Sequence, residues 1–118
     1  MFQFNENEAI WKQIGDDIKK KIFAGQYLTG SQIESVRELA SMYGVNPNTI
    51  VKSLAVLEQE GVIKTERGIG KFVAFDQQQI DNNKKQWAES IVNHCIEECA
   101  AINVDINMIL EIIKMKGE

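Results

Sequence analysis

The chain has 118 residues, 44% of them apolar and 25% charged, a composition typical of one small globular domain with or without an appendage. No apolar run approaches the roughly 18 residues needed to span a bilayer, and the N-terminus lacks the charged and then apolar pattern of a signal peptide. The sequence therefore predicts a soluble cytoplasmic protein without a membrane partner.

The net charge of −4 comes from the C-terminal part of the chain. Residues 1–75 contain 9 Lys/Arg and 9 Asp/Glu, whereas residues 76–118 contain 4 Lys/Arg and 8 Asp/Glu. An acidic chain lacks the usual signature of a nucleic-acid-binding protein, but a neutral module can still present a local basic face. The side chains that could form such a face are Lys19, Lys20, Lys21, Arg37, Lys52, Lys64, Arg67 and Lys71.

A first helix is predicted over about Glu8 to Ala24. Its apolar stripe recurs every four residues, as expected for one face of an amphipathic helix. Gly25 ends the helix, and the segment from Gln26 to Gln32 is interpreted as a turn-rich link. The stripe consists of Ile10, Ile14, Ile18 and Ile22.

Two short helices joined by a tight turn are predicted next. Ser35 and Glu38 have the Ser-x-x-Glu spacing of a capping box, in which each side chain binds a backbone N–H at the helix start. Gly44 suits the left-handed residue that ends a helix. Asn46 followed by Pro47 suits the N-cap and the first position of the next helix.

The second of these helices is predicted over Pro47 to about Glu60. Its polar side carries Asn48, Thr49, Lys52 and Ser53, and its apolar side carries Ile50, Leu54 and Leu57. A second helix with polar residues at its exposed start is what a helix-turn-helix presents to the major groove of DNA. DNA binding is therefore the leading hypothesis.

A β-hairpin is predicted after this helix. Val62–Thr65 and Lys71–Phe75 are β-like runs on either side of a Gly-x-Gly tip formed by Gly68 and Gly70. Glycines allow the backbone to approach a phosphate or a narrow groove, and Arg67 beside the tip adds charge. Three helices and a hairpin predict a winged helix-turn-helix over residues 1–75.

Residues 76–118 are predicted to form two helices that dimerise. One helix runs from Gln77 to Ala101, and a shorter one follows a break at Asn103, capped by that residue or by Asp105. Apolar faces outside the winged domain need a partner, and the simplest is the same pair of helices in a second subunit. The expected dimer residues are Trp87, Ile91, Cys95, Ile106, Ile109, Leu110 and Ile113. The predicted fold is thus mainly α with one small hairpin.

The chain resembles the GntR family of bacterial transcription regulators, most closely its short YtrA-like branch. The resemblance covers roughly Ala9 to Phe75 and, more loosely, the two-helix tail. The motifs that carry it, in the family's order and spacing, are Ile10-Trp11-x-Gln13-Ile14, Ile22-Phe23-x-Gly25, Ser35-Val36-Arg37-Glu38-Leu39-Ala40, Val45-Asn46-Pro47-Asn48-Thr49, Leu57-Glu58-x-Glu60-Gly61 and Arg67-Gly68-x-Gly70-x-Phe72-Val73.

The resemblance implies a homodimeric regulator, usually a repressor, that binds a palindromic operator in double-stranded DNA. By the family's pattern Arg37 and the start of the second helix contact DNA, and the hairpin glycines lie by the minor groove. The expected DNA-contacting residues are Ser35, Arg37, Asn46, Pro47, Asn48, Thr49, Lys52, Arg67, Gly68, Gly70 and Lys71.

Three positions depart from the family pattern. The chain has Ile33-Glu34-Ser35 where Leu-Pro-Ser is usual, and Thr29 where proline is frequent. Glu34 would either weaken binding near a phosphate or point to solvent. Ile69 stands where lysine is common, which would weaken the contact made by the hairpin.

Alternatives remain at the level of sequence. Arg37 could pair with Glu34 or Glu38 on the surface, and the winged domain could be a protein-interaction module with docking helices. A metal- or thiol-responsive regulator would use Cys95 and Cys99, although two cysteines four residues apart are more often small apolar residues of a helix seam. A small-molecule effector would have to favour one arrangement of the two DNA-binding heads. With a single histidine and no phosphate-binding loop, the chain is not expected to be an enzyme or to hold a cofactor or metal.

Overall fold

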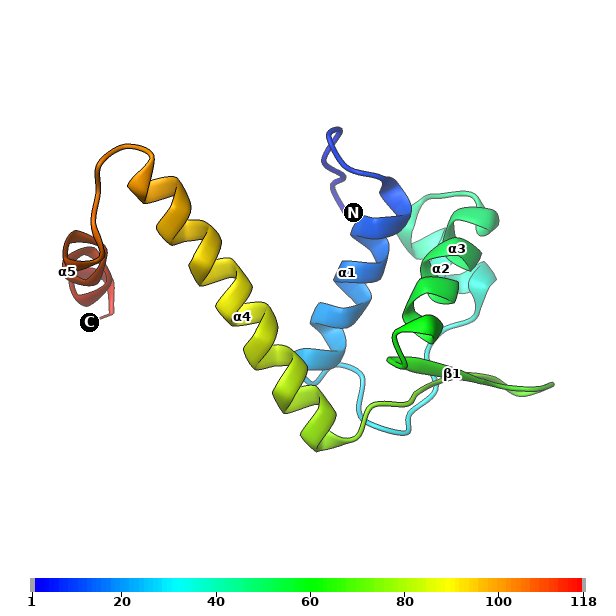
Figure 1. Cartoon of the computed structure of the whole chain (residues 1–118). Coiled ribbons are helices and arrows are strands. Elements are labelled where there is room, and N and C mark those ends of the chain that lie inside the picture. The colour runs from blue at the N-terminus through cyan, green and yellow to red at the C-terminus, as the bar shows by residue number, and fades with distance from the viewer. Residues whose placement is uncertain (1, 118) are drawn as a thin grey trace. The chain divides into compact units, whose positions relative to one another are not determined.

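The computed structural model describes residues 2–117 and confirms a mainly helical chain with one antiparallel hairpin (Figure 1). Its contacts define a first unit that ends at Asp81 and a second that begins at Asn82, and each is described by itself. The elements are α1 (Ile10–Phe23), α2 (Val36–Tyr43), α3 (Pro47–Gln59), β1 (Ile63–Glu66), β2 (Gly70–Val73), α4 (Gln77–Ala100) and α5 (Ile106–Lys116).

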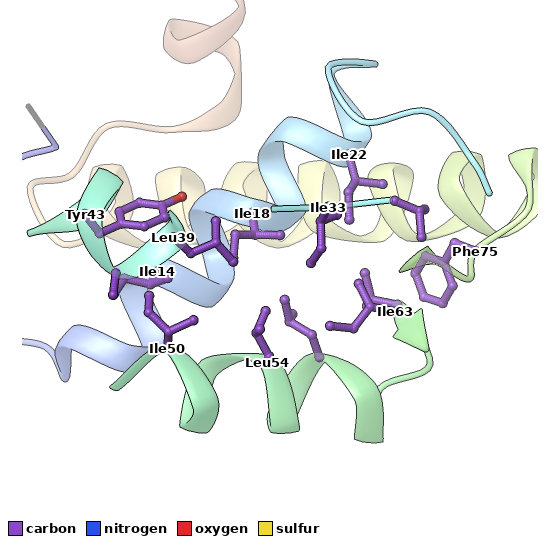
Figure 2. Packing of buried hydrophobic residues seen from close by; sticks show 14 of the residues in the cluster. Ile14, Ile18, Ile22, Ile33, Leu39, Tyr43, Ile50, Leu54, Ile63 and Phe75 are labelled. Atoms are coloured by element: carbon purple, nitrogen blue, oxygen red, sulfur yellow. The ribbon is translucent and has the colours of Figure 1, made fainter. Parts of the chain in front are cut away.

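The core of the first unit lies between α1 and α3. Figure 2 shows Ile14 of α1 next to Ile50 of α3 and Ile18 facing Leu54, with side chains from α2 at one end of the core and Ile63 of the hairpin at the other. Ile10 is 45% exposed, so the buried stripe of α1 begins one turn later than the sequence predicted. The innermost side chains are Ile14, Ile18, Ile22, Leu39, Ile50, Leu54, Leu57, Val62, Ile63 and Val73.

Ser53 corrects the predicted polar side of α3. Only 1% of the residue is exposed, and its hydroxyl donates to the carbonyl oxygens of Trp11 at 2.6 Å and Thr49 at 3.1 Å. Positions 50, 53, 54 and 57 share one face of a helix, so Ser53 belongs to the stripe that packs on α1. Its hydroxyl is satisfied by carbonyl oxygens, which makes its burial acceptable.

The link before α2 contains a strand-like segment that the sequence interpretation missed. Residues 30–33 run antiparallel to β2: the N–H of Ile33 donates to Lys71 at 2.9 Å, and that of Val73 donates to Ser31 at 2.9 Å. β2 therefore lies between this segment and β1, with Ile63 opposite Val73 in the hairpin. The extra pairing fixes the start of α2 beside the hairpin.

The N-terminal residues are bound to α1 and α2. The side-chain amide of Gln13 accepts the N–H of Asn5 at 2.7 Å and donates to the carbonyl oxygens of Asn5 and Glu8 at 2.7 and 3.0 Å. The ring of Phe2 packs edge-on against Tyr43, with centroids 5.4 Å apart. These contacts hold the extended residues before α1 against the end of α2.

The second unit consists of α4 from Asn82 onward and α5, and it has few buried side chains. Asp105 caps α5 by accepting the N–H of Met108 at 3.0 Å, and Asn103 in the preceding turn has φ 61°. Within residues 82–117 only Ile109 is buried, while many large apolar side chains are exposed. Across residues 2–117, none of the helices combines the length and the apolar content that crossing a membrane requires.

Candidate nucleic-acid interface

The capping box at the start of α2 is present as predicted. Ser35 Oγ accepts the N–H of Glu38 at 3.1 Å, and Glu38 Oε1 accepts the N–H of Ser35 at 3.0 Å. Both side chains therefore satisfy backbone donors that the helix start leaves free. The reciprocal pair orders the first turn of α2, which carries Arg37 on its exposed surface.

Arg37 has a free guanidinium on this surface. Within residues 2–117 it makes no ion pair or hydrogen bond, and the two carboxylates that could neutralise it have other partners. Glu38 is in the capping box, and Glu34 accepts the hydroxyl of Tyr27 at 2.5 Å. Burial and this hydrogen bond raise the pKa of Tyr27, which keeps the hydroxyl a donor. The side chain of Glu34, one of the positions that depart from the family pattern, therefore points toward Tyr27.

The start of α3 is built as the sequence predicted. Gly44 takes the left-handed conformation, with φ 68°, and lets the chain turn between the two helices. Asn46 Oδ1 accepts the N–H of Asn48 at 2.8 Å, and Pro47 occupies the first helical position. Asn48 is exposed and Thr49 partly exposed, so both polar side chains are available at the helix start.

A groove of about 330 Å³ separates the start of α2 from the β1–β2 hairpin, hereafter the wing. It brings Ser35 together with Gly68, Gly70 and Lys71, which lie more than 30 positions away in the sequence. Gln32, which the sequence interpretation did not single out, bridges the groove by donating its side-chain N–H to the carbonyl oxygen of Ile69 at 3.1 Å.

The wing glycines adopt backbone conformations that other residues avoid. Gly68 has φ 78° with open space where a Cβ would lie, whereas Gly70 has φ 149° and its Cβ would lie 2.4 Å from Gln32 Nε2. We expect Gly70→Ala to lower the free energy of unfolding by about 1–3 kcal/mol, and Gly68→Ala by roughly 1 kcal/mol. Urea unfolding measures both.

Gly15 provides the control for these two substitutions. It lies inside α1, and a Cβ there would make an ordinary contact, 3.9 Å from Leu57 Cδ2. Gly15→Ala is therefore expected to stabilise the domain by about 0.4–1 kcal/mol. Equal effects of the three alanine substitutions would contradict the assignment of strain to the wing.

The predicted basic residues do not form one free surface. Lys52 Nζ lies 4.8 Å from the centroid of the Trp11 ring, and Lys19 Nζ lies 3.0 Å from Glu60, so both lysines sit at the seam between α1 and α3. Lys71 Nζ is 2.6 Å from the Glu58 carboxylate. In the described part of the chain, Arg67 of the wing, like Arg37, has neither an ion pair nor a hydrogen bond.

The capping box also predicts a pH effect. Hydrogen bonds from the backbone and side chain of Ser35 lower the pKa of Glu38. Because the native pKa is lowered, this stabilisation is complete above the unfolded-state pKa and is lost as the pH falls through the native one. We expect Ser35→Ala to move the Glu38 pKa part of the way back and to reduce stability more at neutral than at acidic pH. NMR titration and urea unfolding check this, and an unchanged Glu38 pKa would contradict it.

The two cysteines lie one helical turn apart on α4. Cys95 is exposed and Cys99 partly buried, and desolvation together with a hydrogen bond to Cys95 raises the pKa of Cys99. A raised pKa keeps the thiol protonated, whereas reactive cysteines have lowered values. Residues 2–117 contain no cluster of three or more His, Cys, Asp or Glu side chains arranged to hold a metal.

Comparison with known sequences identifies the family. Residues 11–73 match the model of the bacterial regulatory proteins, gntR family. The uncharacterized HTH-type transcriptional regulator YhcF of Bacillus subtilis is 30% identical over 112 residues, covering 95% of this chain and 93% of the relative. The HTH-type transcriptional repressor YtrA of the same organism is 40% identical over 65 residues, or 55% of this chain and 50% of that protein.

The fold of the chain also resembles that of solved structures. A GntR family transcriptional regulator from Listeria monocytogenes superposes with a TM-score of 0.90 at 33% identity, covering 95% of this chain and 98% of that one. The DNA-binding domain of AraR, solved in complex with operator ORX1, gives 0.56 at 30% identity, covering 63% and 93%. The family and these relatives are described as transcriptional regulators. The capped helix pair, the wing and these matches together place the chain in the GntR family, as a DNA-binding transcriptional regulator.

Proposed function

We propose that the protein is a sequence-specific repressor that binds a palindromic operator as a homodimer. The observation that carries this proposal is the exposed, capped start of α3 next in sequence to a helix whose first turn carries an unpaired Arg37. Two relatives support it: YtrA is a repressor by name, and the AraR domain was solved on an operator.

Each part of the interface has a distinct proposed task. Asn48 and Thr49, with Asn46 and Pro47 holding the helix start, would meet base edges in the major groove and supply specificity. Ser35 would contact the phosphate backbone, and Arg37 would contact either a phosphate or a base edge. Arg67, with the glycines Gly68 and Gly70, would follow the backbone along the wing. Lys52 keeps its place over Trp11 and contributes through its charge.

The second unit is proposed to join the two subunits. A group of large apolar side chains on α4, α5 and the turn between them stays exposed in the single chain, which is more than a soluble monomer usually leaves in water. A two-fold pair of such units would bury them against each other and fix the distance between two half-sites. These side chains are Ile91, Val92, Ile102, Ile106, Met108, Leu110, Ile112, Ile113 and Met115.

Selection from random duplex DNA with the purified full chain tests the proposal. We expect enrichment of two inverted half-sites whose centres lie about one helical turn or a multiple of it apart. A transcription assay on a promoter carrying that site should then show lower output with the protein present. No enriched sequence from a folded dimer at low salt would reject the proposal in favour of a protein-interaction module, whereas one half-site alone would reject the dimer.

A further inference from the structure

Three polar side chains from three different elements meet where the tip-side half of the wing faces the end of α3. Lys71 of β2 places its Nζ 2.6 Å from Glu58 Oε1 at the end of α3 and 2.7 Å from Thr65 Oγ1 on β1. The hydroxyl of Thr65 also donates to Glu58. Sequence spacing gave no sign of this cluster, because its members are adjacent only after the hairpin folds back on α3.

The cluster lies where apolar packing of the wing ends. Ile63 is the only buried residue of β1, and the three residues that follow it are exposed. The side chains of Lys71 and Glu58 are 25% and 34% exposed, so their contact is partly shielded from water. The hydrogen bond from Lys71, and then that from Thr65, lowers the pKa of Glu58, as expected for a carboxylate held by charge-assisted bonds.

We propose that Glu58, Thr65 and Lys71 form a clamp that sets the direction of the wing relative to α3, and that Lys71 is a positioning residue for operator binding instead of a phosphate contact. This inference rests on the proposed DNA-binding function. In a winged domain α3 and the wing must engage the duplex together, so an error in their angle costs one contact or the other. The direct charge contact of the wing is then left to Arg67, which has no partner among residues 2–117.

Removing the charge of Glu58 distinguishes between the two alternative roles of Lys71. If Lys71 contacted a phosphate, Glu58→Gln would free its ammonium, remove a repelling carboxylate and strengthen operator binding. If the three side chains form a clamp, Glu58→Gln loosens the wing and weakens binding, by about 3- to 10-fold. Glu66→Gln is the matched control, because it removes the same charge from the wing, where Glu66 pairs with Lys64 at 3.4 Å, without touching the clamp.

Exchanging the charges gives the second test. The double variant Glu58→Lys with Lys71→Glu keeps the net charge and restores an ion pair of the opposite sense. The clamp predicts tighter operator binding by the double variant than by either single variant, as measured by fluorescence anisotropy. Weaker binding by the exchange variant than by Lys71→Met, or tighter binding by Glu58→Gln than by Glu66→Gln, would overturn the proposal.

Measurements on the free protein test the clamp without DNA. Lys71→Met should raise the Glu58 pKa seen by NMR and should speed hydrogen exchange of the wing amides, while amides in α1 stay unchanged. Unchanged exchange in the wing would overturn the clamp even where operator binding is intact. A clamp that passes this test in a protein that selects no DNA would instead count against the proposed function alone.

Discussion

Replacing Leu110 and Ile113 together by lysine is expected to lower operator affinity by about 100-fold or more, since linked binding sites commonly gain 10²–10⁴ over single ones. Both side chains lie on the exposed apolar surface of α5 and are 49% and 58% exposed in the single chain. Lysine at either position would have to be buried without a partner in a dimer, which strongly disfavours association. Sedimentation velocity should show a monomer, and anisotropy should show the loss of affinity.

The polar side of the same helix offers a charge-matched control. Asn107→Lys with Glu111→Gln also raises the net charge of α5 by two, at positions outside its apolar surface. We expect this control to remain dimeric and to bind the operator at least as well as the natural chain. Added positive charge by itself favours DNA binding, so it works against the predicted loss. A dimeric Leu110→Lys, Ile113→Lys variant would show that the subunits join elsewhere.

Replacing Arg37 by alanine is expected to weaken operator binding by about 10- to 100-fold, equivalent to ~1–3 kcal/mol for one well-placed arginine contact. Within residues 2–117 the guanidinium of Arg37 makes no ion pair, so its removal should leave the free energy of unfolding unchanged. If the contact is to a phosphate, the slope of log affinity against log salt should fall by about one. Anisotropy at several salt concentrations measures both quantities.

Two further variants sharpen this prediction. Arg37→Lys keeps the charge but loses the planar fork, so an intermediate affinity would indicate a bidentate contact. Lys85→Ala removes one positive charge from the exposed surface of α4 and should change affinity little. Equal losses in Lys85→Ala and Arg37→Ala would mean that only the overall charge matters and that Arg37 makes no specific contact.

Local signals explain why the elements could be predicted so closely. Ser35 with Glu38, Gly44 and Asn46 with Pro47 act within a few residues of one another, so the sequence contains the whole cause of each helix boundary. In the structure α2 begins after Ser35 and ends before Gly44, and α3 begins at Pro47. Apolar spacing likewise predicted the buried sides of α1 and α3, apart from the exposed first turn at Ile10.

The errors concern contacts between distant segments. Residues 30–33 are too short a segment for their sequence to indicate a strand. They are extended and paired in the structure because β2 lies beside them. Ser53 was predicted to lie on the polar side of α3, but it packs on α1. Lys71 and Lys52 looked like free charges near the interface, yet Glu58 and Trp11 lie beside them in the fold. The periodicity of apolar residues indicates which side of an element is buried, but it does not show which residues of other elements lie against that side.

The position of β1 has a consequence for the behaviour of the protein at high concentration. With β2 paired on both sides, β1 has no strand on its outer edge within the described residues, and such an edge can recruit a strand from another molecule. Lys64 and Glu66 are exposed on this short strand and oppose such recruitment, because a second molecule would have to accommodate both charges. The charges on this short edge strand therefore disfavour strand pairing between molecules when the protein is concentrated.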